Sequence, residues 1–128
     1  MESVTPNKEK AKALLKMAEI TLERLETTDT EKYPSNTLLD YYDAIHKLLE
    51  AIAASKGLKF RGEGAHAELI DFISKTELDE HSRALLQQMR DYRNRISYEG
   101  FSLNRNYITL NTGKINGIVS RLRQKLQS

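Results

Sequence analysis

The chain has 128 residues, of which 39% are hydrophobic and 30% charged, and its formal net charge is +2. This length is enough for one domain over residues 1–128 and too short for two, and the composition is typical of a soluble globular protein rather than a disordered or membrane-spanning one. Because the sequence contains no cysteine, disulfides, thiol catalysis and cysteine-ligated metals are excluded.

The sequence gives no sign of a membrane span, a leader peptide, a metal site or a cofactor. No stretch approaches the roughly 18 consecutive apolar residues that a membrane span needs. The segment from Met1 to Pro6 lacks a basic start followed by an apolar run, so we expect a cytoplasmic location. The three histidines, His46, His66 and His81, have neither HxxxH nor HExxH spacing, so we expect no dedicated metal site and no cofactor.

The first long segment with helical spacing of apolar residues predicts a helix from near Pro6 to about Glu26. Thr5 is the expected N-cap, because proline is favoured at the first helical position. The polar, β-branched linker 27–30 is unsuited to continuing this helix. Its apolar stripe consists of Ala11, Leu15, Ala18, Leu22 and Leu25.

The second predicted helix follows Pro34, with Ser35 or Asn36 as its N-cap. Its apolar residues follow an i, i+4, i+7, i+11, i+14 series and are Leu38, Tyr42, Ile45, Leu49 and Ile52. Tyr41 points about 100° away from Tyr42, so we expect it outside the core and available at an interface. The acidic residues of this helix are expected on a solvated face; they are Asp40, Asp43 and Glu50.

A glycine-rich turn is predicted next, because Gly57, Gly62 and Gly64 interrupt the helical pattern and tolerate positive φ. A short helix follows, with Leu69, Ile70 and Ile73 as its apolar residues. We expect His66 to cap or pack at the start of this helix, and contact with a phosphate is the alternative. The turn lacks the GxxxxGK[ST] pattern of a phosphate-binding P-loop.

Two further helices complete the predicted fold. The fourth begins near Asp79 and ends around Gly100, and its apolar face consists of Leu85, Met89, Tyr92 and Ile96. Residues 107–110 alternate weakly and are expected to form a short extended piece. The fifth helix is marked by Ile115, Ile118, Val119, Leu122 and Leu126. We therefore predict an all-α, up-and-down bundle of four main helices plus a short one.

The basic residues are concentrated in the C-terminal third. Residues 81–128 carry 9 Lys+Arg and 2 Asp+Glu, a net charge of +7, so the preceding residues carry −5. Most of these cations are arginines, whose planar guanidinium suits phosphate. The asymmetry indicates either a nucleic acid, nucleotide or acidic partner, or two halves that neutralise each other within the fold or across a dimer.

The end of the fourth helix contains the most informative string of polar residues. Arg90, Asn94 and Tyr98 are spaced i, i+4 and i+8 and form one polar row, with Arg93 beside it. Arg93 and Tyr98 are about 140° apart on a helical wheel, so we expect them to meet only if the helix unwinds near Gly100 or a second subunit completes the site. The alternative is an exposed, arginine-rich helix end with Tyr98 packed as a lid over the core.

The segment from Arg93 to Tyr98 resembles the Arg-Asn-x-x-x-His motif of the HEPN superfamily (higher eukaryotes and prokaryotes nucleotide-binding), which lies near the end of a late bundle helix. Residues 41–45 resemble the second helix of that family, and residues 57–60 with 64–66 resemble its loop before a short third helix. The similarity extends over roughly Ala11 to Leu126. It implies the same helical bundle that the apolar spacing predicts independently.

Many HEPN proteins are metal-independent ribonucleases in which the arginine and histidine of the motif act together in a homodimer. Here Arg93 and Asn94 match the motif, and Tyr98 occupies the position of the histidine. A histidine with a pKa of about 6.5 exchanges protons near neutrality, whereas an unperturbed tyrosine with a pKa of about 10 does so poorly. The resemblance therefore favours binding over cleavage.

We expect a HEPN-like, homodimeric protein that binds a nucleotide, RNA or a minimal nucleotidyltransferase partner, as in some toxin and antitoxin pairs, with weak or no nuclease activity. The expected binding residues are Arg90, Arg93, Asn94, Arg95 and Tyr98. The alternative enzyme is a ribonuclease that uses Arg93 with Tyr98 or His66 as the acid and base. A third possibility is a dimeric adaptor without nucleotide affinity.

Overall fold

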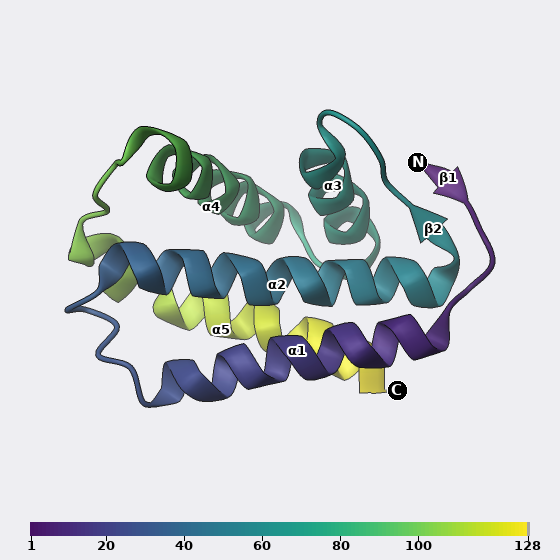
Figure 1. Cartoon of the computed structure of the whole chain (residues 1–128), viewed down its shortest axis with the longest axis horizontal. Helices are drawn as coiled ribbons and strands as arrows, with labels where there is room; N and C mark the ends of the chain where they lie inside the picture. Colours follow the sequence, from purple (N-terminus) through teal and green to yellow (C-terminus); the bar gives the residue numbers. More distant parts are fainter. Residues whose placement is uncertain (128) are drawn as a thin grey trace.

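The computed structural model describes residues 1–127 and shows an all-α bundle of five helices with one small antiparallel strand pair (Figure 1). The elements in chain order are β1 (Glu2–Ser3), α1 (Lys8–Glu26), α2 (Pro34–Lys56), β2 (Leu58–Lys59), α3 (Ala65–Glu77), α4 (Glu80–Glu99) and α5 (Arg105–Gln127). The four long helices and the shorter α3 confirm the predicted fold class. None of the helices in residues 1–127 is both long enough and apolar enough to cross a membrane.

Helix α2 lies at the centre of the bundle and packs against each of the other four helices (Figure 1). Its predicted apolar series is buried throughout, with Leu38, Ile45 and Leu49 each at most 1% exposed. Tyr41 is also buried, at 6% exposure, so the prediction that it lies outside the core was wrong. The helix is covered on more than one side, and both neighbouring tyrosines therefore face a packed neighbour.

The N-termini of the first two helices differ from the predictions. Helix α1 begins at Lys8, not near Pro6, and its N-cap is Asn7, whose side chain accepts a hydrogen bond from the backbone N–H of Lys10. Thr5 lies upstream of the helix, because the backbone N–H of Asn7 is bound to the carbonyl oxygen of Ala54. This bond holds the chain in an extended N-terminal strap, defined here as residues 1–7.

Helix α2 begins at Pro34, and the residue at its N-cap position is Tyr33, not Ser35 or Asn36. The hydroxyl of Ser35 accepts a hydrogen bond from the backbone N–H of Leu103, 2.9 Å away. It thereby links the start of α2 to the segment between α4 and α5. Ser35, which the sequence predicts as an N-cap of α2, therefore makes a tertiary contact instead.

The later helices follow the prediction more closely, with one correction. Asp79 caps α4 and Gly100 ends it in a left-handed conformation, as expected. The buried face of α4 contains Leu86 in addition to Met89. Residues 107–110 are helical, not extended, because α5 already starts at Arg105 and Ile108 is buried in phase with Ile115.

The N-terminal strap is fastened along the end of α2. Strand β1 pairs with β2, with Glu2 opposite Lys59, and the backbone N–H of Val4 donates to the carbonyl oxygen of Gly57 at 2.8 Å. Gly57 has a φ of +72°, and a Cβ atom placed there would clash with the carbonyl oxygen of Val4. The close approach of the strap therefore requires glycine at this helix end.

We predict that Gly57→Ala costs at least about 1 kcal/mol more in unfolding free energy than Gly100→Ala. Both glycines end a helix in the left-handed conformation, but the space around Gly100 is open, so Gly100→Ala pays only the backbone strain of about 1–2 kcal/mol. Urea denaturation followed by circular dichroism measures the difference. Equal losses for the two variants would mean that the strap does not press on Gly57.

Candidate functional site

The last two turns of α4 bring three of the predicted site residues into contact. Arg93 donates from Nη1 to Oδ1 of Asn94 at 3.1 Å and to the hydroxyl of Tyr98 at 3.5 Å, and its guanidinium lies 5.8 Å from the centre of the Tyr98 ring. The helix stays regular to Glu99, so neither unwinding nor a second subunit is needed. The helical-wheel expectation was wrong because the long arginine side chain reaches along the helix to the next turn.

The other two arginines have different surroundings. Arg90 donates from Nε to the side-chain oxygen of Gln87 at 2.9 Å. Arg95 lies on another side of the helix, where its guanidinium is 4.0 Å from the centre of the Phe101 ring and 5.8 Å from that of Tyr92. Stacking of this kind stabilises the end of α4 against the core. The structure therefore separates Arg95 from the cluster around Arg93.

Several basic residues of the C-terminal third are neutralised within the fold. Arg83 binds Glu80 and Asp71, while the remaining pairs are Arg121 with Asp79, Arg123 with Glu19 and Lys125 with Glu77. By contrast, Arg90, Arg93 and Arg95 are half-buried and have no carboxylate partner within residues 1–127. The unneutralised positive charge of α4 is therefore concentrated in its C-terminal half.

Arg93 and Ser97 face a cavity of about 280 Å³ between α4, α2 and α3. Its other walls are formed by Leu39, Asp40, Tyr42, Asp43, His46 and His66. Both aspartates in this wall are paired, Asp40 with Arg24 at 3.0 Å and Asp43 with Lys47 at 2.7 Å. Two of the three residues of the predicted acidic face, Asp40 and Asp43, are therefore held in ion pairs, and neither of them neutralises the charge that Arg93 contributes to the cavity.

Two histidines that are far apart in the sequence stack at this cavity. The ring centres of His46 and His66 are 3.9 Å apart, with an angle of 27° between the planes. His46 donates from Nδ1 to Glu50 at 2.9 Å, and the Nδ1 atom of His66 is 3.2 Å from the hydroxyl of Tyr42. The Nε2 atom of His46 is buried without a hydrogen-bond partner among the described residues. His66 thus packs near the start of α3, as expected, and also lines the cavity.

Sequence reasoning missed the part of the site that α2 contributes. Tyr42, His46 and Glu50 are spaced i, i+4 and i+8, so a search for polar side chains along one line of the helix would have grouped them. The pairing of His46 with His66 has no such local signal, because it depends on how α3 packs against α2. Ser97 was not singled out, since it occupies an unspecified position of the motif.

The environment of the cluster shifts three ionisation equilibria. Partial removal of the His66 ring from water lowers its pKa below the usual value, because desolvation disfavours the charged form. Electrostatic interactions with His46 and Arg93 add to this effect. The hydrogen bond from His46 holds the pKa of Glu50 below its usual range. Burial raises the pKa of Tyr42 to about 12. At neutral pH the site therefore combines a neutral His66, an ionised Glu50 and a protonated Tyr42.

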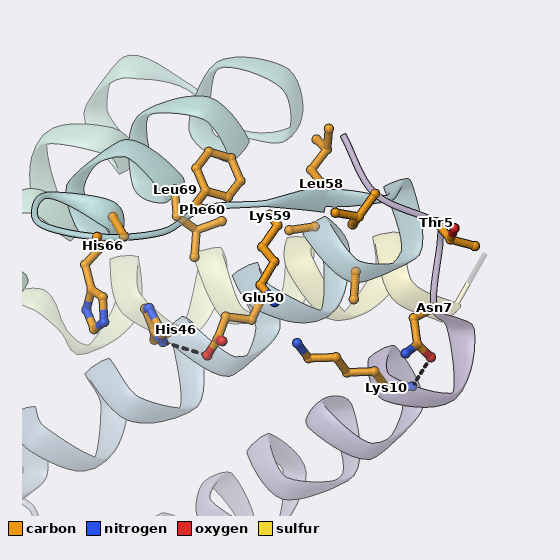
Figure 2. Close-up of a pocket in the computed structure, with 15 residues that line it drawn as sticks. Thr5, Asn7, Lys10, His46, Glu50, Leu58, Lys59, Phe60, His66 and Leu69 are labelled. Carbon is orange, nitrogen blue, oxygen red and sulfur yellow. Dashed lines mark hydrogen bonds and ion pairs between the residues drawn. The ribbon is translucent and has the colours of Figure 1, made fainter. Parts of the chain in front are cut away.

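A second and larger cavity, of about 450 Å³, lies on the other side of the histidine pair, between the N-terminal strap and α3 (Figure 2). His46, Glu50 and His66 form part of its wall, and Lys10 and Lys59 reach into it. The two histidines thus belong to both cavities. A ligand that extends past them would contact both.

No group of three or more histidine, aspartate or glutamate side chains within residues 1–127 is arranged to hold a metal ion. Comparison of the chain with protein-family models, with curated proteins and with solved structures finds no match. The residues of the site offer a cation and a hydroxyl for a phosphate, and two imidazoles that can donate or accept hydrogen bonds.

We predict that His66 titrates below its usual pKa of about 6.5 and that Arg93→Gln raises that pKa, because the variant removes a neighbouring positive charge. His66 binds its proton less tightly in the folded protein than in the unfolded chain. The free energy of unfolding therefore falls as the pH is lowered from about 6.5 through the pKa of His66 in the folded protein. Histidine ring resonances followed by NMR against pH measure the shift.

The matched control is Arg83→Gln, which removes the same charge from the same helix but is not among the groups that shift the pKa of His66. A His66 pKa at or above the usual value in the unaltered protein would contradict the electrostatic account of the site. An equal change in the pKa of His66 in Arg93→Gln and Arg83→Gln would also contradict it.

Proposed function

We propose that this chain is a HEPN-like helical bundle that binds a phosphate-bearing ligand, RNA or a nucleotide, through the C-terminal half of α4. The residues assigned to binding are Arg90, Arg93, Asn94 and Tyr98, and Arg95, whose guanidinium stacks on Phe101, is left out of this set. The observation that carries the proposal is that the half-buried guanidinium of Arg93 has no carboxylate partner within residues 1–127 and lines a cavity beside a serine hydroxyl. A half-buried cation without a counter-charge favours an anionic ligand.

The residues have distinct roles in this proposal. Arg93 contacts the phosphate, and Asn94 holds its guanidinium in place from the same helix. Tyr98 is 76% exposed and offers a flat surface on which a base can stack. Arg90 adds positive charge one turn away, whereas Arg95 stabilises the helix end through its contact with Phe101.

We predict that Arg93→Ala abolishes binding of single-stranded RNA or mononucleotides, because it removes the only guanidinium that lines the smaller cavity. Arg83→Ala is the matched control, since it removes an arginine of α4 that is already paired with Glu80 and Asp71. Gel shift and fluorescence anisotropy at several salt concentrations measure binding, which should weaken as salt rises. Unchanged affinity in a folded Arg93→Ala protein would rule this surface out.

A second candidate function, a metal-independent ribonuclease, is favoured by one observation. His66 lines the same cavity as Arg93, and its lowered pKa leaves it neutral and able to accept a proton near pH 7. In this mechanism Arg93 stabilises the developing negative charge on the phosphate. His66 takes the role of the motif histidine, whose position is occupied by Tyr98 in this chain. The hydroxyl of Tyr98, near Arg93, is then the proton donor.

We predict that any RNA cleavage by the purified protein in EDTA disappears in Arg93→Ala and falls at least about 100-fold in His66→Ala, because general acid and base catalysis typically contributes that much. Tyr98→Phe tests the proton donor separately from His66, since it retains the ring and removes the hydroxyl. Product formation on denaturing gels is the readout. Cleavage that persists in both His66→Ala and Tyr98→Phe would remove both residues from the mechanism.

The resemblance also extends the proposal to a homodimer and to a minimal nucleotidyltransferase as partner. The exposed Tyr98 lies at the end of α4, where a second protein would contact the binding residues directly. An adaptor without nucleotide affinity would show stable self-association and no salt-sensitive binding. Light scattering of the purified protein, with and without the ligand, distinguishes these forms.

A further inference from the structure

The larger cavity has a polar centre that the binding of a phosphate does not use. The carboxylate of Glu50 sits in its wall, and the side chains of Lys10 and Lys59 both extend toward it (Figure 2). No ion pair joins Glu50 to either lysine within residues 1–127; its partner is His46. A hydrogen-bond acceptor and two cationic donors therefore lie close together with bonding capacity to spare.

Part of the remaining wall is apolar and offers a surface for a flat ring. This part is formed by Ala53 and Ala54 of α2, Leu58 and Phe60 of the following segment, and Leu69 of α3. Phe60 is only partly buried, and its ring lies on the α3 side of the segment, 5.9 Å from the ring of Phe72 (Figure 2). The volume of about 450 Å³ lies within the range of small-molecule sites, which combine an apolar lining with a few convergent polar groups.

We propose that the larger cavity is a specificity pocket for a guanine base. The carboxylate of Glu50 accepts hydrogen bonds from the adjacent N1–H and N2–H groups of the base, and a lysine ammonium donates to O6. The base lies against the apolar part of the wall and is contacted at its Watson–Crick edge, as proteins contact unpaired bases. This inference rests on the proposed function, because it assigns the base of the ligand whose phosphate Arg93 binds.

The donor and acceptor pattern of the pocket selects guanine over the other bases. Guanine presents two neighbouring donors to a carboxylate that has only acceptors. Adenine and cytosine place an unprotonated ring nitrogen beside their amino group, and uracil has one N–H between two carbonyl groups, so each turns an acceptor toward Glu50. The lowered pKa of Glu50 keeps its carboxylate ionised at neutral pH, which maintains this discrimination.

The two cavities are placed for the two ends of one nucleotide. His46 and His66 belong to the walls of both, so the two cavities adjoin at the histidine pair and Arg93 lines the far one. A base in the larger cavity has its sugar near His66 and its phosphate toward Arg93 and Ser97. The exposed face of His66 is then available to the sugar or the base.

The first test varies only the ligand. GMP, IMP, AMP, CMP and UMP are titrated against the unaltered protein, with binding followed by calorimetry or NMR shifts. We expect GMP to bind at least about tenfold more tightly than IMP, which lacks only the 2-amino donor to Glu50. Equal affinities for GMP and IMP, or a preference for any other base, would overturn the guanine pocket.

The second test separates the base from the phosphate. Glu50→Gln should remove the preference for GMP while leaving the affinity for UMP within about twofold, because it puts an amide donor where guanine has its own donors. Glu23→Gln, an exposed carboxylate of α1 that lines neither cavity, is the matched control. Arg93→Ala should weaken all five ligands. Thermal unfolding confirms that each variant is folded.

The outcomes distinguish this inference from the function on which it depends. If all five nucleotides bind with Arg93-dependent but equal affinity, the phosphate site stands and the guanine pocket is wrong. If none binds the unaltered protein, both are wrong. A GMP preference that survives Glu50→Gln would assign the base to another part of the molecule.

Discussion

The burial of α2 is the constraint on which the rest of the structure depends. A helix that packs against four others has little surface left for solvent, so its polar side chains must find partners inside the bundle or line a cavity. Tyr42, His46 and Glu50 follow one line of α2 and do both. The two cavities exist where α3, α4 and the N-terminal strap leave this polar line uncovered, and the position of the candidate site follows from it.

Several of the basic residues in the C-terminal third form ion pairs with acidic residues from distant parts of the chain. Arg121 and Arg123 of α5 reach Asp79 and Glu19, which lie far away in the sequence. Each of these exposed pairs contributes only about 0–1 kcal/mol of stability, but together they neutralise much of the C-terminal positive charge. What distinguishes Arg93 is that it remains without a carboxylate while lying beside a cavity, which a count of charges along the sequence cannot show.

The sequence was sufficient to predict the helices and much of the core, because these depend on local periodicity. The series from Leu38 to Ile52 and the ends of α4 at Asp79 and Gly100 are local patterns and were predicted correctly. Features set by contacts between distant segments were not: Asn7 replaces Thr5 as a cap because the strap is fastened to α2, and Ser35 binds the backbone of Leu103. In the site, residues 90–98 could be chosen from their spacing on one helix. The stacking of His46 on His66 could not, because twenty residues and a turn separate them.

The fastening of the strap has a kinetic consequence for the larger cavity. Strands β1 and β2 are two residues each, and a strand pair of that size is only marginally stable. Val4, Thr5 and Asn7 form one wall of the cavity, so that wall belongs to a part of the chain that can detach without disturbing the core around Leu38 and Ile45. Local opening of the strap therefore changes the shape of the cavity, on a timescale much shorter than that of global unfolding.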